Sequence, residues 1–222
     1  MTDKYQGKVD DRTYAGEDVD IQYSLKRCIH AKECVNHLSQ VFDVNKRPWI
    51  DANGASGNAV AQVIDLCPSG ALHYTRNDDG DSETTPEINQ IILWHDGPLQ
   101  VKGDLAIQGA TVAIEDETRA TLCRCGASAN KPFCDNTHKK TGFVAEAFTP
   151  SKPVDTDADT SGKVTLTATK NGSLKVEGNF RIENIAGDIL YTGSKTWLCR
   201  CGGSSSKPFC DGTHNTNGFE AE

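Results

Sequence analysis

The stretch LCRCGASANKPFCDNTH at residues 122–138 returns as LCRCGGSSSKPFCDGTH at residues 198–214. Thirteen of the seventeen residues are identical, and each copy spaces its ligand-type residues as C-x-C-x8-C-x3-H. Three thiols and one imidazole are the four donors that a tetrahedral metal or an iron–sulfur cluster needs. The repeated stretch therefore predicts two metal centres and divides the second part of the chain into two similar units.

The spacing within each copy predicts that the ligands act in pairs. Cys123 and Cys125 are two residues apart, so in an extended segment their side chains point to the same side and can hold one iron. Cys134 and His138 are four residues apart, which on a helical turn places them on one face, where they can hold a second iron. Asp135 is expected to cap that turn. The second copy gives the same roles to Cys199, Cys201, Cys210 and His214.

A zinc site is the alternative, because three Cys and one His also form a zinc-binding set. Ordinary zinc ribbons pair their ligands as C-x2-C, whereas both copies here begin with C-x-C. The spacing therefore favours a cluster over zinc. Gly126 and Gly202, which follow the second Cys of each copy, are expected to let the backbone come close to sulfur.

With its ligands spaced in this way, C-R-C-G-x-S-x-x-K-P-F-C-D-[NG]-T-H resembles the signature of the CDGSH (NEET) iron–sulfur proteins. The resemblance implies one 2Fe-2S cluster per copy, with the His bound to iron through a ring nitrogen. Asn136 stands where the second copy has Gly212, and Asn tolerates the left-handed conformation that Gly would adopt. Many members are homodimers anchored in a membrane. Two copies in one chain resemble the tandem type, which implies a monomer whose repeats pack as an internal pseudo-dimer.

A different cysteine pattern precedes the repeats and consists of Cys28, Cys34 and Cys67, the last followed by Pro. It is the ferredoxin pattern C-x2-C-x2-C with a distant C-P, in which Ala31 replaces the middle thiol. It resembles the divergent mono-cluster ferredoxin domain found ahead of CDGSH repeats. Three thiols suit a 3Fe-4S cluster, and a 4Fe-4S cluster completed by water or a neighbouring His stays open. His30 is either that ligand or a hydrogen-bond donor to one, and three structural cysteines without metal are the remaining alternative.

The sequence predicts an α+β protein of three units. Residues 12–75 form an N-terminal ferredoxin-like α/β domain, and residues 88–149 and 164–222 form two small β-rich CDGSH repeats. Acidic and polar segments at residues 75–87 and 150–163 separate these units.

Local patterns place the first elements of each unit. Val19, Ile21 and Tyr23 alternate with polar residues as in a half-buried strand. Apolar residues step at helical spacing from Val60 to Cys67, after the capping-type residues Ser56 and Asn58. Asp-Gly at residues 96–97 and Asn-Gly at residues 171–172 lie between β-rich runs, so each repeat is expected to open with an antiparallel hairpin.

Charge and composition restrict the class of partner. A net charge of −8 and a pI of about 5.2 argue against binding of nucleic acid or anionic lipid. No apolar run approaches the ~18 residues of a membrane span, and no export signal is visible. Nine cysteines are an odd number and fall into three sets of three, which favours thiolate ligands over disulfides. We therefore expect a soluble, cytoplasmic protein.

Two functions agree with these patterns. Electron transfer is the first, because an imidazole ligand raises the potential of a cluster and a ferredoxin-type cluster usually has a lower one. The partner would then be a redox protein that fits an acidic surface. The alternative is a cluster carrier or a redox or pH sensor that donates 2Fe-2S clusters to a cluster-free acceptor protein, because imidazole detaches more readily than thiolate. No catalytic or nucleotide-binding motif indicates an enzyme, and reduction of a substrate at a cluster stays open.

Overall fold

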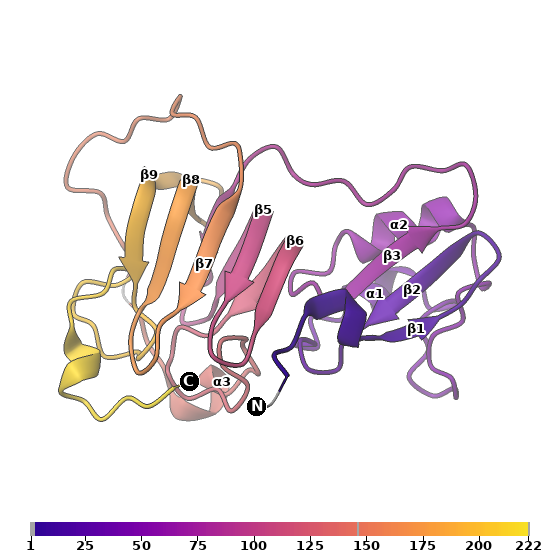
Figure 1. Ribbon diagram of the computed structural model, residues 1–222, viewed down its shortest axis with the longest axis horizontal. Helices are drawn as coiled ribbons and strands as arrows, with labels where there is room; N and C mark the ends of the chain where they lie inside the picture. Colours follow the sequence, from indigo (N-terminus) through magenta and orange to yellow (C-terminus); the bar gives the residue numbers. More distant parts are fainter. Residues whose placement is uncertain (1–2, 146, 222) are drawn as a thin grey trace. The chain divides into compact units, whose positions relative to one another are not determined.

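A computed structural model describes residues 3–145 and 147–221 of the chain. Strands dominate and helices are few and short, which confirms the mixed α+β class (Figure 1). The chain divides into two compact units, one of Gly7–Thr84 and one of Met1–Gln6 with Thr85–Glu222. Glu146 and Glu222, which belong to the predicted repeats, lie outside the described residues. None of the helices in the described ranges has the length and apolarity that crossing a membrane requires.

The unit of residues 7–84 is a small antiparallel sheet covered by a helix (Figure 1). Strand β2 pairs with β1 on one side and with β3 on the other. The elements of this unit are η1 (Gly7–Asp10), β1 (Arg12–Tyr14), β2 (Val19–Tyr23), α1 (Glu33–His37), α2 (Gly57–Ile64) and β3 (Leu72–Arg76). The alternating pattern of β2 is confirmed, whereas a ferredoxin-like classification of this unit stays a prediction.

Helix α2 begins as its sequence predicts and ends earlier than expected. The Ser56 hydroxyl accepts a hydrogen bond from the Ala59 N–H at 3.4 Å, which caps the helix. Val60 and Ile64 are fully buried against the sheet. The expectation that Cys67 continues this helix is wrong, because α2 ends at Ile64 and the Cys67 N–H donates to the Ile64 carbonyl in the turn that follows. Cys67 therefore lies on the loop after α2 and not on the face of the helix.

Both predicted hairpins are present in the second unit, one in each repeat. Asp96 and Asn171 adopt the left-handed conformation, with φ of 45° and 49°, which the tight turns require. Each hairpin is followed by a third, antiparallel strand. The strands are β4 (Gln90–Leu93), β5 (Leu99–Gln108) and β6 (Ala113–Leu122) in the first repeat, and β7 (Val164–Ala168), β8 (Leu174–Asn184) and β9 (Ile189–Leu198) in the second.

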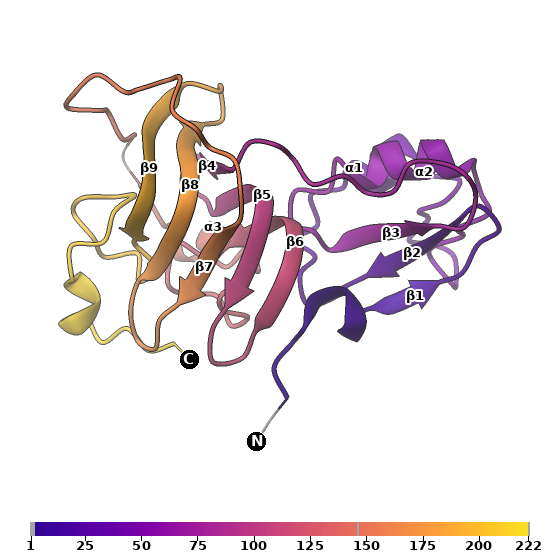
Figure 2. The same ribbon diagram turned by 45° about the horizontal axis from the view of Figure 1, so that its top comes forward.

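The first strand of each repeat keeps its own hairpin partner and also pairs with the other repeat (Figure 2). Strand β4 pairs in parallel with the second half of β8, and β7 pairs in parallel with the second half of β5. Strands β5 and β8 are long enough for this because each pairs with its own hairpin partner through its first half. A shift in register divides the two halves of each long strand. The two repeats thus form one six-stranded sheet.

Asn89, just before β4, fixes the start of this strand between the two repeats. Its side-chain amide donates to the carbonyl oxygens of Gly162 and Asn179, at 2.7 and 2.9 Å, and its side-chain oxygen accepts from the Asp104 N–H at 2.9 Å. A Cβ on Gly103 would overlap this side chain, which explains a glycine with φ of 146° at the register shift of β5. One buried amide therefore bonds to backbone of both repeats.

A single apolar core lies under this sheet. It takes residues from both repeats, among them Leu99, Phe133, Phe180 and Leu198, each at most 1% exposed. A module of about 60 residues buries too little apolar surface to be stable without help. Sharing one core between the repeats supplies that burial.

The loops after β6 and β9 contact each other through two glycines. Gly126 and Gly202 have φ of 82° and 78°. A Cβ on Gly126 would overlap the Cys201 carbonyl oxygen, and a Cβ on Gly202 would overlap the Cys125 carbonyl oxygen. These glycines were expected to let the backbone come close to sulfur, and their N–H groups do bond to the sulfurs of Cys123 and Cys199. Their missing Cβ also admits the backbone of the other repeat, which was not expected.

Replacement of Gly202 tests this contact. Gly202→Ala is expected to lower the thermal midpoint of the full chain by about 5–10 °C, because the new methyl group both strains a left-handed residue and displaces a backbone carbonyl. Gly187→Ala is the matched control, since Gly187 has φ of 89° and nothing within 4 Å of its Cβ position. The control should lose only about 2–4 °C. Equal losses in differential scanning calorimetry would contradict the contact.

Candidate metal centres

The first two ligands of each repeat lie side by side. The sulfurs of Cys123 and Cys125 are 3.8 Å apart, and those of Cys199 and Cys201 are also 3.8 Å apart. The extended backbone after β6 and β9 places them there, and the N–H of the first Cys is fixed by a 2.8 Å hydrogen bond to a proline carbonyl in both repeats. Two sulfurs at this separation can bind one iron.

The last two ligands of each repeat form a second pair. Cys134 Sγ lies 3.5 Å from His138 Nδ1, and Cys210 Sγ lies 3.4 Å from His214 Nδ1. The expected helical turn does not bring them together, because α3 (His138–Thr141) begins only at the histidine and the second repeat has just the short η2 (Thr213–Asn215). The turn before each histidine makes the pair instead.

An aspartate organises that turn in both repeats. Asp135 accepts hydrogen bonds from the N–H groups of Thr137 and Ala129 at 3.0 and 2.9 Å, and Asp211 accepts the equivalent bonds from Thr213 and Ser205. The Thr213 hydroxyl and these N–H groups hold the pKa of Asp211 well below its usual range. The aspartates bond to N–H groups of this turn, but the expectation that they cap a helical turn is wrong, because the N-caps of the helices that follow are Thr137 and Gly212. The Asp211 carboxylate stays charged at neutral pH.

The residue after this aspartate donates to the ligand sulfur. Asn136 and Gly212 adopt the left-handed conformation, with φ of 68° and 87°, as predicted for the replacement of Gly by Asn. In this conformation their N–H groups point at Cys134 and Cys210, with N···S distances of 3.3 and 3.4 Å. Such bonds stabilise a thiolate and influence the potential of a cluster bound to it.

These donors fit a two-iron cluster. Each repeat offers two pairs, one of two sulfurs and one of sulfur and imidazole nitrogen, and a 2Fe-2S cluster needs two ligands on each iron. Within residues 3–145 and 147–221, no three His, Cys, Asp or Glu side chains gather around one point closely enough to hold a single ion. All nine cysteines are free thiols.

The pairing of Cys123 with Cys125 also shifts the pKa values of these two thiols. A hydrogen bond from the Cys123 thiol lowers the pKa of Cys125 to about 6, and sharing that proton raises the pKa of Cys123. Burial raises the pKa of Cys134 to about 11. Burial also lowers the pKa of His138, which keeps its imidazole neutral. Because metal binds thiolate and neutral imidazole, a cluster entering this pocket releases thiol protons but none from the histidine.

The second pairs of the two repeats differ in exposure. Cys134 and His138 are buried, at 3% and 7% exposed. Cys210 and His214 are partly exposed. Solvent and other proteins therefore have better access to the ligands of the second repeat.

The three cysteines of the unit of residues 7–84 surround one pocket. Cys28, Cys34, Cys67 and His30 all line a cavity of about 350 Å³. One water occupies roughly 30 Å³ in the liquid, so the cavity holds a group much larger than a single ion. Burial, followed by the nearby sulfur of Cys67, raises the pKa of the Cys34 thiol to about 11. The pocket fits a multi-iron cluster with three thiolate ligands.

His30 lies close to one of these thiols. It adopts a left-handed conformation, with φ of 54°, and its Nδ1 lies 3.9 Å from Cys28 Sγ. Its side chain is exposed at the rim of the pocket. The structure therefore allows His30 as a ligand or as a neighbour of one, as the sequence did.

Tyr23 belongs to this pocket, and the sequence did not identify it. Burial, together with the charge of Cys28 and a hydrogen bond to it, raises the pKa of Tyr23. The Trp49 ring packs edge-on against Tyr23 with centroids 4.9 Å apart, which fixes the phenol. The alternation of β2 placed Tyr23 on the core side, but only the fold brings it to Cys28.

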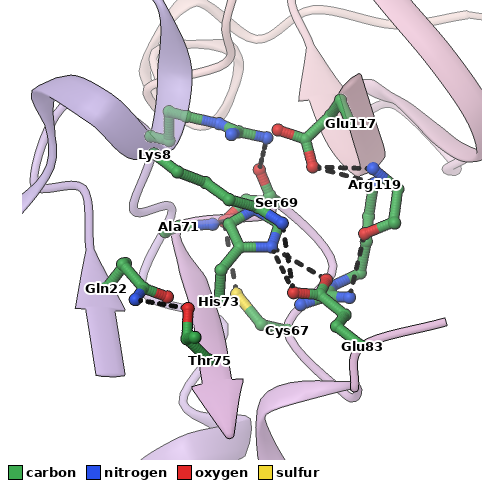
Figure 3. Close-up of polar contacts among 12 residues, drawn as sticks. Lys8, Gln22, Cys67, Ser69, Ala71, His73, Thr75, Glu83, Glu117 and Arg119 are labelled. Carbon is green, nitrogen blue, oxygen red and sulfur yellow. Dashed lines mark hydrogen bonds and ion pairs between the residues drawn. The ribbon is translucent and has the colours of Figure 1, made fainter. Parts of the chain in front are cut away.

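Polar contacts fix the loop that carries Cys67 (Figure 3). Cys67 Sγ lies 3.6 Å from the Ser69 hydroxyl, which also accepts from the Ala71 N–H. Further along, fully buried His73 points at Glu83, with Nδ1 2.8 Å from one carboxylate oxygen. These contacts tie the loop and the end of the unit to strand β3.

Comparison with known proteins agrees with these sites. Residues 14–77 match the family described as "Divergent 4Fe-4S mono-cluster", and residues 96–139 and 171–215 match the family described as "Iron-binding zinc finger CDGSH type". The uncharacterized protein YjdI of Escherichia coli K12 is 38% identical over 63 residues, which cover 28% of this chain and 83% of that protein. YjdI of E. coli O157:H7 matches to the same extent. No solved structure matches.

The fold and the ligand sets together define an iron–sulfur protein. The chain belongs to the family in which a divergent 4Fe-4S mono-cluster domain is followed by CDGSH-type iron-binding segments, here two of them. The resemblance predicted from the sequence is confirmed.

Removal of one thiol tests the assignment of the first pocket. Cys34→Ser is expected to abolish the electron paramagnetic resonance signal of the tri- or tetra-iron cluster and to leave both 2Fe-2S signals, because the two units are compact by themselves. Cys125→Ser is the matched control and should affect only a 2Fe-2S signal. Loss of all signals in Cys34→Ser would mean that the units do not hold their clusters independently.

Proposed function

We propose that this protein transfers electrons through three iron–sulfur clusters. Cys123, Cys125, Cys134 and His138 would hold one 2Fe-2S cluster, and Cys199, Cys201, Cys210 and His214 a second. Cys28, Cys34 and Cys67 would hold a 3Fe-4S or 4Fe-4S cluster. The repeats would act as an internal pseudo-dimer in a cytoplasmic monomer, where free thiols persist.

The contact between the two loops after β6 and β9 carries this proposal. The backbone of Cys125 touches Gly202 and the backbone of Cys201 touches Gly126, so the two ligand sets are neighbours inside one unit. A carrier needs only one cluster at a time, whereas two adjacent clusters let an electron pass from one to the other. The shared core also keeps their separation constant.

The ligands set the direction of electron flow. Each imidazole replaces a thiolate and makes the centre less negative, which raises its reduction potential, whereas ferredoxin-type centres held by thiolates have lower potentials. Electrons would therefore pass from the first unit to the repeats. The acidic chain, with a net charge of −8, would attract a basic redox partner.

Cluster donation is the second candidate, and the exposure of the second repeat favours it. Cys210 and His214 are partly exposed where Cys134 and His138 are buried, so an acceptor protein could reach the second site directly. On this proposal the second repeat would donate its cluster and the first would keep its own.

A redox titration with iron analysis separates the two functions. Electron transfer predicts repeated reduction and oxidation of all centres with unchanged iron content, also in the presence of a cluster-free acceptor protein. Transfer of iron and sulfide to the acceptor, together with irreversible reduction, would contradict electron transfer and support donation.

Exchange of the exposed imidazole for a thiolate gives a second test. His214→Cys should slow the acid loss of the second cluster by roughly tenfold at pH 6, because imidazole detaches from iron more readily than thiolate does. It should also lower the potential of that cluster. Stopped-flow absorbance after a pH jump measures the loss. His95→Gln is the control at an exposed histidine, and unchanged acid lability of His214→Cys would show that His214 is not a ligand.

A further inference from the structure

Each repeat buries one arginine between its first two ligands. Arg124 and Arg200 are 3% and 2% exposed. Arg124 donates to the carbonyl oxygens of Gly97 and Trp94 at 2.9 and 2.7 Å, and Arg200 donates to those of Gly172 and Thr169 at 3.0 and 2.5 Å. Both guanidinium groups are therefore fixed by the hairpin turn of their own repeat.

These arginines point away from the ligands of their own repeat. Neighbouring residues of an extended segment face opposite sides, so Arg200 lies across the backbone from Cys199 and Cys201. The ring of Phe219 covers Arg200, with the guanidinium carbon 5.4 Å from its centroid, and Phe143 covers Arg124 at 5.5 Å. A permanent positive charge is thus held in an apolar layer where solvent screens it little.

The other repeat lies close to both arginines. The loops that carry them touch through Gly126 and Gly202. Cys123 of the first repeat lies within electrostatic reach of Arg200, and Cys199 of the second repeat and Asp96 of its own hairpin lie within electrostatic reach of Arg124. Arg200 Nη1 is buried and has no hydrogen-bond partner among the described residues.

We propose that Arg124 and Arg200 are crossed positioning residues, each of which places a fixed positive charge beside the ligand set of the opposite repeat and raises the reduction potential of the cluster held there. The proposal rests on the proposed 2Fe-2S clusters in both repeats. A nearby cation stabilises the reduced, more negative state of a cluster. The potential of each centre would then depend on the other repeat.

The test needs the two centres to be distinguishable. His138→Cys serves as a label, because an all-thiolate cluster in the first repeat has a lower potential and separates its signal from that of the second. In this background, Arg200→Gln should lower the potential of the first-repeat cluster, so that the ratio of reduced to oxidised centre at a fixed applied potential falls roughly tenfold, which is about 59 mV for a one-electron couple. The second-repeat cluster should shift less. Arg124→Gln should give the reverse order.

Two controls decide the result. Lys195→Gln removes an exposed charge four residues before Cys199, already paired with Glu177 at 3.1 Å, and should shift neither centre appreciably. Arg200→Lys keeps the charge, should restore most of the potential, and carries the test if Arg200→Gln does not fold. If neither variant folds, Arg200 is a folding residue and the proposal is overturned.

The remaining outcomes separate this proposal from the proposed function. A larger shift in the cluster of the mutated repeat, or equal shifts in both, would overturn crossed positioning and would leave the proposed protein with two 2Fe-2S clusters intact. An unmutated chain without acid-labile sulfide in its repeats would overturn the proposed function and this inference together.

Discussion

The rest of the structure depends on the pairing between the repeats, in which β4 pairs with β8 and β7 pairs with β5. Each repeat alone is too small to bury a sufficient core, and each long strand uses its second half to bind the first strand of the other repeat. One core and one sheet result. The Asn89 side chain bonds to the backbone of both repeats, so a single buried amide links the first repeat to the second.

The pairing between the repeats also determines where the ligands lie. The first cysteines follow directly after β6 and β9, so the sheet brings their loops together until the backbones touch at Gly126 and Gly202. Within each loop, the N–H groups of the turn point at Cys134 or Cys210 and at the aspartate that follows. The pockets are thus built locally, and their closeness comes from the sheet. The proposed electron transfer between the repeats and the proposed crossed charges both depend on that closeness.

Sequence patterns predicted what depends on neighbours along the chain. The ligand sets, the two hairpins, the start of α2 at Ser56 and the left-handed Asn136 all follow from residue type and short spacing. The parallel pairing of β4 with β8 leaves no local signal, because its residues are about 90 positions apart. For the same reason the contact of Gly126 with the other repeat was not predicted, and Tyr23 was not assigned to the first pocket. A four-residue spacing suggested a helix where an aspartate turn forms instead, since the two structures place residues four apart at a similar distance.

All three proposed clusters contain inorganic sulfide, and iron and sulfide analysis of anaerobically purified protein measures their presence most directly. Two 2Fe-2S clusters and one 3Fe-4S or 4Fe-4S cluster require seven or eight irons per chain, matched by equal or nearly equal acid-labile sulfide. In the reduced protein, low-temperature electron paramagnetic resonance should show two 2Fe-2S signals. The first pocket should add a signal in the oxidised protein if it holds 3Fe-4S, and in the reduced protein if it holds 4Fe-4S. A colourless protein that holds zinc and no sulfide would contradict the account.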